Sequence, residues 1–314
     1  MIDVGGTDTK TGVLLPDDTL TGAGSIPTPH GPDTAGNVLD LAADHVRRAR
    51  AAHPDLAGVG LVVPGIVDDD AGRAVLATNM GWQDVPFAAL LRDRTGLPAA
   101  LGHDVASAGL AELQYGVADP PPGAGPSPEP ALPAGTTADA AVIVIGTGIA
   151  AALFAGGRPV RGGGYAGELG HAPVEPGGER CACRGRGCLE ALASAGAIAR
   201  RYTARSGHAV TGAEQVLRAA QAGDDDAAAV WQEATVALAR GITVLAAVLA
   251  PRMVILGGGL SGAGAALLDP VRAHLDDMLT VQRRPLLRLG RLGTRAGLYG
   301  AGILARRMAA EVTG

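Results

Sequence analysis

The sequence predicts an α/β protein of two lobes, and three observations carry this prediction. The chain has 314 residues, which is long for one hydrophobic core and comfortable for two domains. Short apolar runs typical of buried strands alternate with helical stretches along it. A glycine turn with a hydroxyl residue follows a predicted strand in each half of the chain, at Gly5-Gly6-Thr7 and at Gly146-Thr147-Gly148.

The first half of the chain alternates predicted strands and helices. Turn residues separate short strands at 2–4, 12–15 and 19–26, and apolar residues at helical spacing predict a helix over 33–53. A buried strand over 58–63 stops at Pro64-Gly65, and two short strands are expected around 68–72. The remaining elements expected here are a helix over 85–95, a strand over 99–101 and a helix over 104–115.

The second half opens with a segment of different composition. Residues 119–137 are rich in Pro and low in complexity, which predicts a surface insert without helix or sheet. A strand resumes over 140–145, and a glycine-dense region runs over 146–187. From Leu189 onward the pattern is mostly helical, except for a strand over 252–256 that ends at Gly257-Gly258-Gly259.

Composition and charge exclude several classes of protein. The formal net charge is −5 with interspersed signs, which is not the basic footprint of a nucleic-acid binder. The most apolar stretch, 241–250, is too short to cross a bilayer. Met1-Ile2-Asp3 lacks the basic and apolar regions of a signal peptide, so we expect a cytoplasmic protein.

The two hydroxyl-bearing glycine turns predict phosphate binding. Glycine lets the backbone approach a phosphate closely, and the amides and the hydroxyls of Thr7 and Thr147 can bind its oxygens. Asp3, just before the first turn, is suited to hold a nucleotide's Mg²⁺ through water. A Gly-Gly hairpin turn is the alternative for the first loop. One such loop in each half of the chain suggests two lobes gripping one polyphosphate.

Two further strand ends carry candidate residues, one for nucleotide binding and one for proton transfer. Gly257-Gly258-Gly259 follows the strand over 252–256, where close backbone approach suits a flat ligand such as adenine; a simple strand-to-helix turn is the alternative. His103-Asp104 follows the strand over 99–101. Asp104 is placed to accept a proton from a substrate hydroxyl, or else to cap the helix that begins there.

All three cysteines fall within eight residues of sequence. Cys181, Cys183 and Cys188, with His171 upstream, supply three thiolates and one imidazole, the donor set of a closed tetrahedral zinc site. An odd, clustered set is a poor disulfide framework. The spacing therefore predicts a structural Zn²⁺ that holds a glycine-rich segment in its folded conformation. The alternative is three unliganded cysteines in a loop.

Taken together, these motifs resemble the ROK family (repressors, open reading frames, kinases) of the actin-like sugar kinases. The resemblance covers residues 1 to about 300. It rests on Asp3-Val4-Gly5-Gly6-Thr7, Pro64-Gly65, Asn79-Met80-Gly81-Trp82, His103-Asp104, Gly146-Thr147-Gly148-Ile149 and Ala166-Gly167-Glu168-Leu169-Gly170-His171, continued by Cys181-x-Cys183-x₄-Cys188-x-Glu190. The last segment is the most specific and supports the zinc assignment.

The resemblance implies a role for each motif. Asp104 takes the position of the catalytic base, and the residues implied to line the sugar pocket are Gly65, Asn79, His103, Glu168, His171 and Glu190. His171 would bind zinc with one ring nitrogen and face the sugar with the other. The residues implied to bind ATP with Mg²⁺ are Asp3, Gly5, Gly6, Thr7, Thr147, Gly148, Gly257, Gly258 and Gly259.

Some positions depart from the family pattern. His103 stands where an Asn is usual, which changes one sugar contact and bears on pH dependence and sugar choice. Ala150-Ala151-Ala152 replaces a glycine run after the second phosphate loop, and we expect it to narrow the nucleotide groove. Arg184 stands where a glycine is expected after the second zinc cysteine.

The sequence thus predicts an actin-like, ribonuclease H-like kinase with a zinc site. We expect a small lobe of residues 1–108 plus 296–314 and a large lobe of 109–295, with the sugar deep in the cleft between them. The resemblance implies phosphorylation of a hexose, foremost glucose at its 6-hydroxyl because of its frequency in the family, by a cytoplasmic homodimer or homotetramer without nucleic-acid or membrane partners.

Two alternatives remain open at this point. The hexose could instead be fructose, mannose or an N-acetylhexosamine, because the polar pocket does not distinguish these sugars. The protein could also be a non-catalytic sugar-binding regulator of the same fold. Regulators carry a DNA-binding domain before the first phosphate loop, and only two residues precede Asp3 here, which argues for the kinase.

Overall fold

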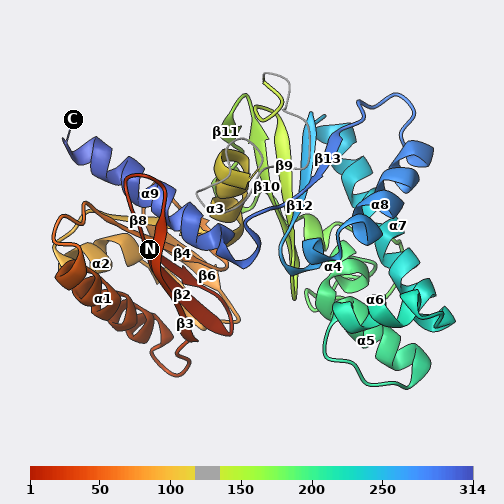
Figure 1. Cartoon of the computed structure of the whole chain (residues 1–314), viewed down its shortest axis with the longest axis horizontal. Helices are drawn as coiled ribbons and strands as arrows, with labels where there is room; N and C mark the ends of the chain where they lie inside the picture. The colour runs from red at the N-terminus through yellow and green to blue at the C-terminus, as the bar shows by residue number, and fades with distance from the viewer. Residues whose placement is uncertain (117–134, 314) are drawn as a thin grey trace. The chain divides into compact units, whose positions relative to one another are not determined.

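The computed structural model describes residues 1–116 and 135–313 (Figure 1). They form two compact units, each described here by itself: the first holds 1–116, 161–166 and 295–313, and the second holds 135–160 and 167–294. This division differs from the expected boundary at residue 108, which would cut through a helix, and it places 161–166 with the first unit. Most of the predicted Pro-rich insert, 119–134, lies outside the described residues.

The first unit is built on a five-stranded sheet of order β3-β2-β1-β4-β8. The central strands β1 (Ile2–Val4), β4 (Val59–Val63) and β8 (Ala99–His103) run parallel, whereas β2 (Asp8–Leu14) and β3 (Leu20–Pro27) pair antiparallel. A second, three-stranded sheet consists of β5 (Ile66–Asp68), β6 (Arg73–Ala77) and β7 (Trp82–Val85).

Helices cover both faces of the larger sheet (Figure 1). Residues of α1 (Thr34–Ala52) and α2 (Phe87–Thr95) form one core with the odd-numbered side chains of β4. The opposite face receives α9 (Ala296–Thr313), because Gly60 leaves room there: a Cβ at Gly60 would lie 1.8 Å from the Ala301 carbonyl oxygen. Helix α3 (Asp104–Ala111) packs against α9 and continues as a π-helical turn over Glu112–Gly116.

The second unit is built on a sheet of order β11-β10-β9-β12-β13. Strands β9 (Ala140–Ile145), β12 (Met253–Gly257) and β13 (Leu286–Leu289) are parallel, whereas β10 (Ile149–Ala155) and β11 (Arg158–Pro159) continue antiparallel. Its core joins the sheet to five helices: α4 (Leu189–Ala193), α5 (Ala195–Ser206), α6 (Ala213–Gln221), α7 (Asp225–Val248) and α8 (Ala265–Met278).

The structure adds strands that the sequence pattern did not predict. β10 lies in the glycine-dense region, β13 lies in the stretch expected to be helical, and β7 ends where a helix was expected to begin at Val85. Short 3₁₀ turns complete the fold, at Gly162–Gly164, Leu169–His171, Gly259–Ala263 and Gly293–Arg295. Among the helices described, none is long and apolar enough to span a membrane.

Candidate functional site

In the first unit, three predicted motifs follow the ends of neighbouring parallel strands. Asp3 of β1 pairs with Val62 of β4, and Val63 pairs with His103 of β8. Because the carboxyl ends of parallel strands meet at one edge of a sheet, the segments that follow them gather there. These segments are Gly5-Gly6-Thr7, Pro64-Gly65 and His103-Asp104.

The first glycine turn has a defined backbone. The Gly5 N–H donates to the Asp8 carbonyl at 2.9 Å, and a Cβ at Gly5 would lie 2.8 Å from that oxygen, so a larger residue does not fit. The Thr28 hydroxyl donates to the Gly5 carbonyl at 2.8 Å. Gly6 and Thr7 are exposed, and Asn79 Nδ2 lies 3.8 Å from the Cβ position of Gly6. The turn therefore presents backbone to solvent beside a predicted sugar-binding amide.

Asp3 is a buried carboxylate beside this turn. Its Oδ2 lies 3.6 Å from Lys10 Nζ, and Gly297 in the first turn of α9 leaves room for it, since a Cβ there would lie 2.4 Å from Oδ2. Burial raises the pKa of Asp3 to about 6, an effect that Lys10 opposes and Asp104 reinforces. A cation near Asp3 would favour its ionised form, which fits the predicted Mg²⁺ role.

Asp104 is the first residue of α3 but not its cap. The cap is His103, whose Nδ1 accepts the Ala106 N–H at 3.2 Å, while Asp104 Oδ1 accepts the Val105 N–H at 2.7 Å. The alternative that Asp104 is present only as a cap is therefore wrong. Burial raises the pKa of the Asp104 carboxyl, although its side chain keeps 28% of its surface exposed. A half-buried carboxylate with a raised pKa suits a general base.

Gly65 is needed for its backbone conformation. Its φ is +96°, and a Cβ would lie 2.3 Å from the Leu76 carbonyl oxygen, so this glycine lets β4 turn tightly into β5.

In the second unit, both predicted nucleotide loops lie at one edge of the sheet. Gly257 of β12 pairs with Val144 of β9, so Gly258 and Gly259 follow β12 next to the point where Gly146 follows β9. Gly258 has φ +79°, and a Cβ there would lie 2.5 Å from the Ile145 carbonyl oxygen. The two loops therefore contact each other through glycine, which leaves exposed backbone at this edge.

The three predicted sugar-binding residues of this unit surround the start of β10. Glu190 Oε2 accepts the Ile149 N–H at 2.9 Å and lies 2.6 Å from the Cβ position of Gly148, so the carboxylate is fixed against the predicted phosphate loop. Gly170 brings its segment onto β10, because a Cβ there would lie 2.0 Å from the Ile149 carbonyl oxygen. Glu168 Oε2 lies 3.8 Å from His171 Nε2.

The other nitrogen of His171 faces the cysteine cluster. Ligand atoms of His171, Cys181, Cys183 and Cys188 all lie within 4.8 Å of one another, with 3.8 Å between His171 Nδ1 and Cys181 Sγ and 3.6 Å between Cys183 and Cys188 Sγ. A tetrahedral Zn²⁺ bonded at about 2.3 Å to sulfur separates its ligand atoms by roughly 3.8 Å. The donor set and spacing therefore fit zinc.

The cysteine loop is held by a tight backbone. The Cys181 N–H donates to the Gly185 carbonyl at 2.9 Å, and the Arg184 N–H donates to the Cys181 carbonyl at 3.0 Å. Gly187 has φ +68°, and a Cβ there would lie 1.7 Å from the Glu175 carbonyl oxygen. Outside the loop, Glu179 pairs with Arg201 of α5 at 2.7 Å. These contacts order a segment with little core of its own.

Comparison with known proteins identifies the family. The family model described as "ROK family" matches residues 1–120 and 131–308. The chain belongs to the ROK family. A glucokinase of Halalkalibacterium halodurans is 32% identical over 327 residues, which cover 98% of this chain and 94% of that protein.

Two solved ROK structures are also similar. The ROK hexokinase of Thermus thermophilus superposes with a TM-score of 0.78 at 32% identity, covering 99% of this chain and 98% of that one. A ROK glucokinase of Streptomyces griseus, in complex with glucose and AMPPNP, has a TM-score of 0.77 at 28% identity and covers 98% of each chain. The expected α/β sugar-kinase fold is thereby confirmed.

Two polar residues near the ROK motifs were missed by sequence reasoning. Asp69 has a buried Oδ1 without a hydrogen-bond partner among the described residues, and its Oδ2 lies 3.7 Å from Arg161 Nε. Burial raises the pKa of Asp69, while Arg161 and His103 lower it. No local signal marks this pair, because Asp69 lies in a run of three aspartates that resembles a solvated turn.

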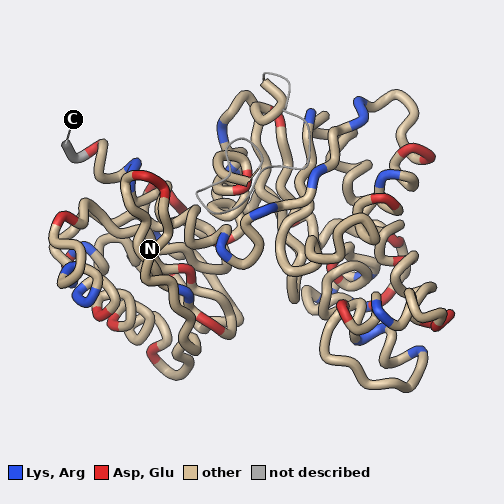
Figure 2. The backbone as a smooth tube through the Cα atoms, viewed as in Figure 1, with Lys and Arg blue, Asp and Glu red and all other residues tan. Residues whose placement is uncertain are grey.

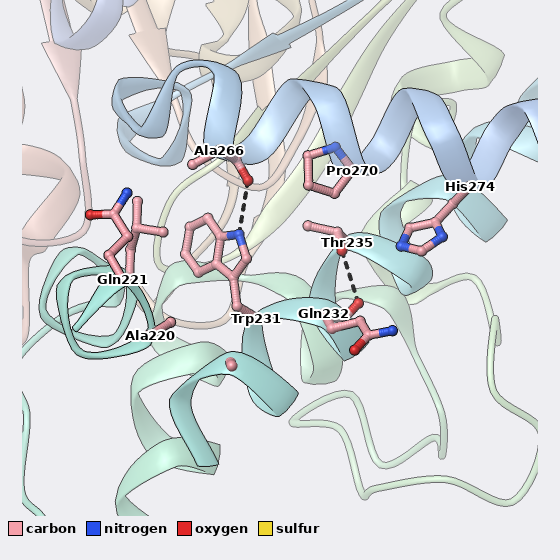
Figure 3. A pocket seen from close by; sticks show the side chains of 10 residues that line it. Ala220, Gln221, Trp231, Gln232, Thr235, Ala266, Pro270 and His274 are labelled. Atoms are coloured by element: carbon pink, nitrogen blue, oxygen red, sulfur yellow. Dashed lines mark hydrogen bonds between the residues drawn. The ribbon is translucent and has the colours of Figure 1, made fainter. Parts of the chain in front are cut away.

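A sizeable apolar pocket of the second unit contains none of the predicted residues. It has a volume of about 440 Å³ and lies between α6, α7 and α8. The Trp231 indole N–H donates to the Ala266 carbonyl at 2.9 Å, so its ring lines the pocket with its polar group already bonded (Figure 3). This pocket lies apart from the residues that carry the ROK motifs.

Proposed function

We propose that this ROK protein is an ATP-dependent hexose kinase, with glucose as the preferred substrate. Relatives named glucokinase and the ROK hexokinase fold support a sugar kinase. The observation that carries the proposal is Asp104, a half-buried carboxylate fixed at the start of α3 beside the first phosphate turn. Acidic and basic residues are interspersed along both units (Figure 2), consistent with a small-molecule substrate.

In the proposed reaction, Asp104 accepts the proton of the sugar 6-hydroxyl. The sugar oxygen then forms a bond to the γ-phosphorus, and the bond between that phosphorus and the bridging oxygen of ADP breaks. The reaction requires the deprotonated carboxylate, and burial, which raises the pKa of Asp104, makes that carboxylate a stronger proton acceptor. Mg²⁺ would be held on the side of Asp3 and would neutralise phosphate charge.

We assign the remaining residues by the same logic. Sugar hydroxyls would be bound by carboxylates, an imidazole and an amide, which accept and donate hydrogen bonds in fixed directions. These residues are Gly65, Asn79, Glu168, His171 and Glu190. Phosphates would be bound by Gly5, Gly6, Thr7, Thr147 and Gly148, and adenine by the backbone of 257–259.

We also propose a structural zinc ion at His171, Cys181, Cys183 and Cys188. With four protein ligands no position stays open for catalysis, so the ion would contribute folding energy. It would also hold the His171 ring in the orientation that points Nε2 toward Glu168. Unpaired cysteines of this kind suit a reducing compartment such as the cytoplasm.

ADP release tests the proposal. We would measure it with ATP and Mg²⁺ over glucose, mannose, fructose, N-acetylglucosamine and N-acetylmannosamine, with a sugar-free reaction as control. The expected result is turnover that depends on sugar, with the highest kcat/KM for glucose. A preference for another hexose would change the substrate but keep the enzyme class. Sugar binding by calorimetry without any turnover would favour a non-catalytic sugar binder, the alternative that the departures at His103 and Ala150–Ala152 motivate.

A further inference from the structure

His103 caps α3 with its side chain, and this fixes where its proton sits. The Nδ1 atom accepts the Ala106 N–H at 3.2 Å, so Nδ1 carries no hydrogen in this arrangement. The neutral ring must then carry its proton on Nε2. The hydrogen-bond network thus assigns the Nε2–H tautomer.

The protonated nitrogen faces the proposed base. His103 Nε2 lies 3.5 Å from Asp104 Oδ1, the same oxygen that accepts the Val105 N–H. This separation exceeds a hydrogen bond, but such bonds in unliganded active sites are often long and shorten when the substrate binds. One carboxylate oxygen is therefore approached by two N–H groups, which leaves Oδ2 for the sugar hydroxyl.

Both nitrogens of the ring are directed at protein groups. The imidazole has only two polar atoms: Nδ1 accepts the Ala106 N–H, and Nε2 faces Asp104 at 3.5 Å, so a sugar hydroxyl would have to compete with Asp104 for Nε2. This differs from the sugar contact that the family resemblance implies for position 103.

Charged groups from several elements surround the His103 ring and Asp104. Carboxylates come from α3 (Asp104) and from the turn between β5 and β6 (Asp69), whose charge Arg161 offsets. Lys10 of β2 and Asp3 of β1 act on Asp104 from the neighbouring strands.

We propose that His103 is a positioning residue for Asp104, and that it orients the base through Nε2–H rather than binding the sugar. The inference rests on the proposed kinase function. Holding Oδ1 fixes the plane of the carboxylate and directs Oδ2 at the reactive hydroxyl. Positioning of this kind matters because a misplacement of about 1 Å can cost roughly 100-fold in rate.

Two variants and one control separate this role from the others. In His103→Ala, kcat should fall about 10–100-fold while KM for glucose stays within about 3-fold. In His103→Asn, the amide oxygen restores the cap, so the melting temperature and part of kcat should recover. The control is Asp33→Ala, which removes the side-chain cap of α1 in the same unit and should lower stability without changing either kinetic constant.

The outcomes also distinguish this inference from the proposed function. A rise in KM with unchanged kcat would show that His103 binds the sugar, and a loss of stability with unchanged kcat would show a cap alone. Nitrogen NMR of the imidazoles tests the tautomer without turnover, with His103→Asn identifying the signal among the seven histidines. The Nε2–H form supports the inference and the Nδ1–H form overturns it, whereas a lack of kinase activity on all hexoses contradicts only the proposed function.

Discussion

Arg184 adopts a backbone conformation that suits glycine. It lies between the second and third cysteines with φ +72°, and its N–H donates to the Cys181 carbonyl at 3.0 Å. Its side chain is exposed. The change Arg184→Gly should therefore relieve backbone strain in the cysteine loop and leave the loop's hydrogen bond in place.

The size of the effect follows from two opposing terms. A non-glycine residue in the left-handed region costs about 1–2 kcal/mol. Glycine offsets about 0.5–1 kcal/mol of this gain, because it loses more conformational entropy on folding. The net gain in the free energy of unfolding should be about 0.5–1 kcal/mol, which corresponds to roughly 1–1.5 °C in melting temperature for a chain of this size.

The backbone strain at Arg184 should also lower the affinity of the cysteine cluster for zinc. If zinc holds the loop in this conformation, relieving the strain tightens zinc binding by about 2–5-fold, the equivalent of 0.5–1 kcal/mol. Both quantities are accessible, by thermal unfolding and by competition with a zinc chelator. The matched control is Arg180→Gly in the same loop, where φ is not positive and glycine should destabilise. A lower melting temperature for Arg184→Gly, or weaker zinc binding, would refute the reasoning.

Three further predictions concern the cysteine cluster, the buried carboxylate of Asp3 and the packing of α9 against α3. Cys183→Ser should lower zinc content and melting temperature together, and full zinc occupancy in this variant, by metal analysis, would argue against its role as a ligand. The folded-state pKa of Asp3, about 6, lies above its unfolded value of 3.8, so its stability contribution is full below pH 3.8 and is lost as pH rises through 6. In chemical denaturation at pH 8, Asp3→Asn should therefore have a higher free energy of unfolding than the wild type, by up to about 3 kcal/mol before the lost Lys10 pairing is subtracted. At pH 4 this gain should be absent. Mg²⁺-dependent turnover of the variant should be impaired. Gly300→Ala should cost about 1–3 kcal/mol in chemical denaturation, because the new Cβ would lie 2.4 Å from the Ser107 carbonyl oxygen; an unchanged midpoint would show that α9 and α3 can separate freely.

The sequence predicted the buried strands well and the alanine-rich one poorly. The runs that became β4 and β9 are dense in Val, Ile and Leu, so their strand state is visible locally. β10 begins Ile149-Ala150-Ala151-Ala152, and alanine is depleted in strands. Its strand state comes from pairing with β9, a contact that the local pattern does not contain.

The site was predictable where its chemistry lies in short motifs. The spacing of Cys181, Cys183 and Cys188 with His171 predicted one cluster, and the structure brings their ligand atoms together. Roles that depend on the residue at which a helix begins were not predictable. His103 rather than Asp104 caps α3, because His103 keeps an extended backbone (φ −72°, ψ 134°) and the helix begins at Asp104.

Pairs between distant segments were also beyond sequence reasoning. Arg161 contacts Asp70 across 91 residues of sequence and also lies near Asp69. The segment 161–166 joins the first unit although both flanking segments belong to the second, so this division differs from a boundary drawn from motif order.

Turnover of Asp104→Asn tests the central claim most directly. Asn keeps the shape, and its side-chain oxygen can still accept the Val105 N–H, while His103 retains the helix cap, so the melting temperature should not fall. We expect kcat for glucose, measured by ADP release, to fall about 10²–10⁴-fold, while calorimetry shows glucose affinity largely preserved. If kcat stays within a few-fold of the wild type, Asp104 is not the base and the mechanism proposed for this protein is wrong.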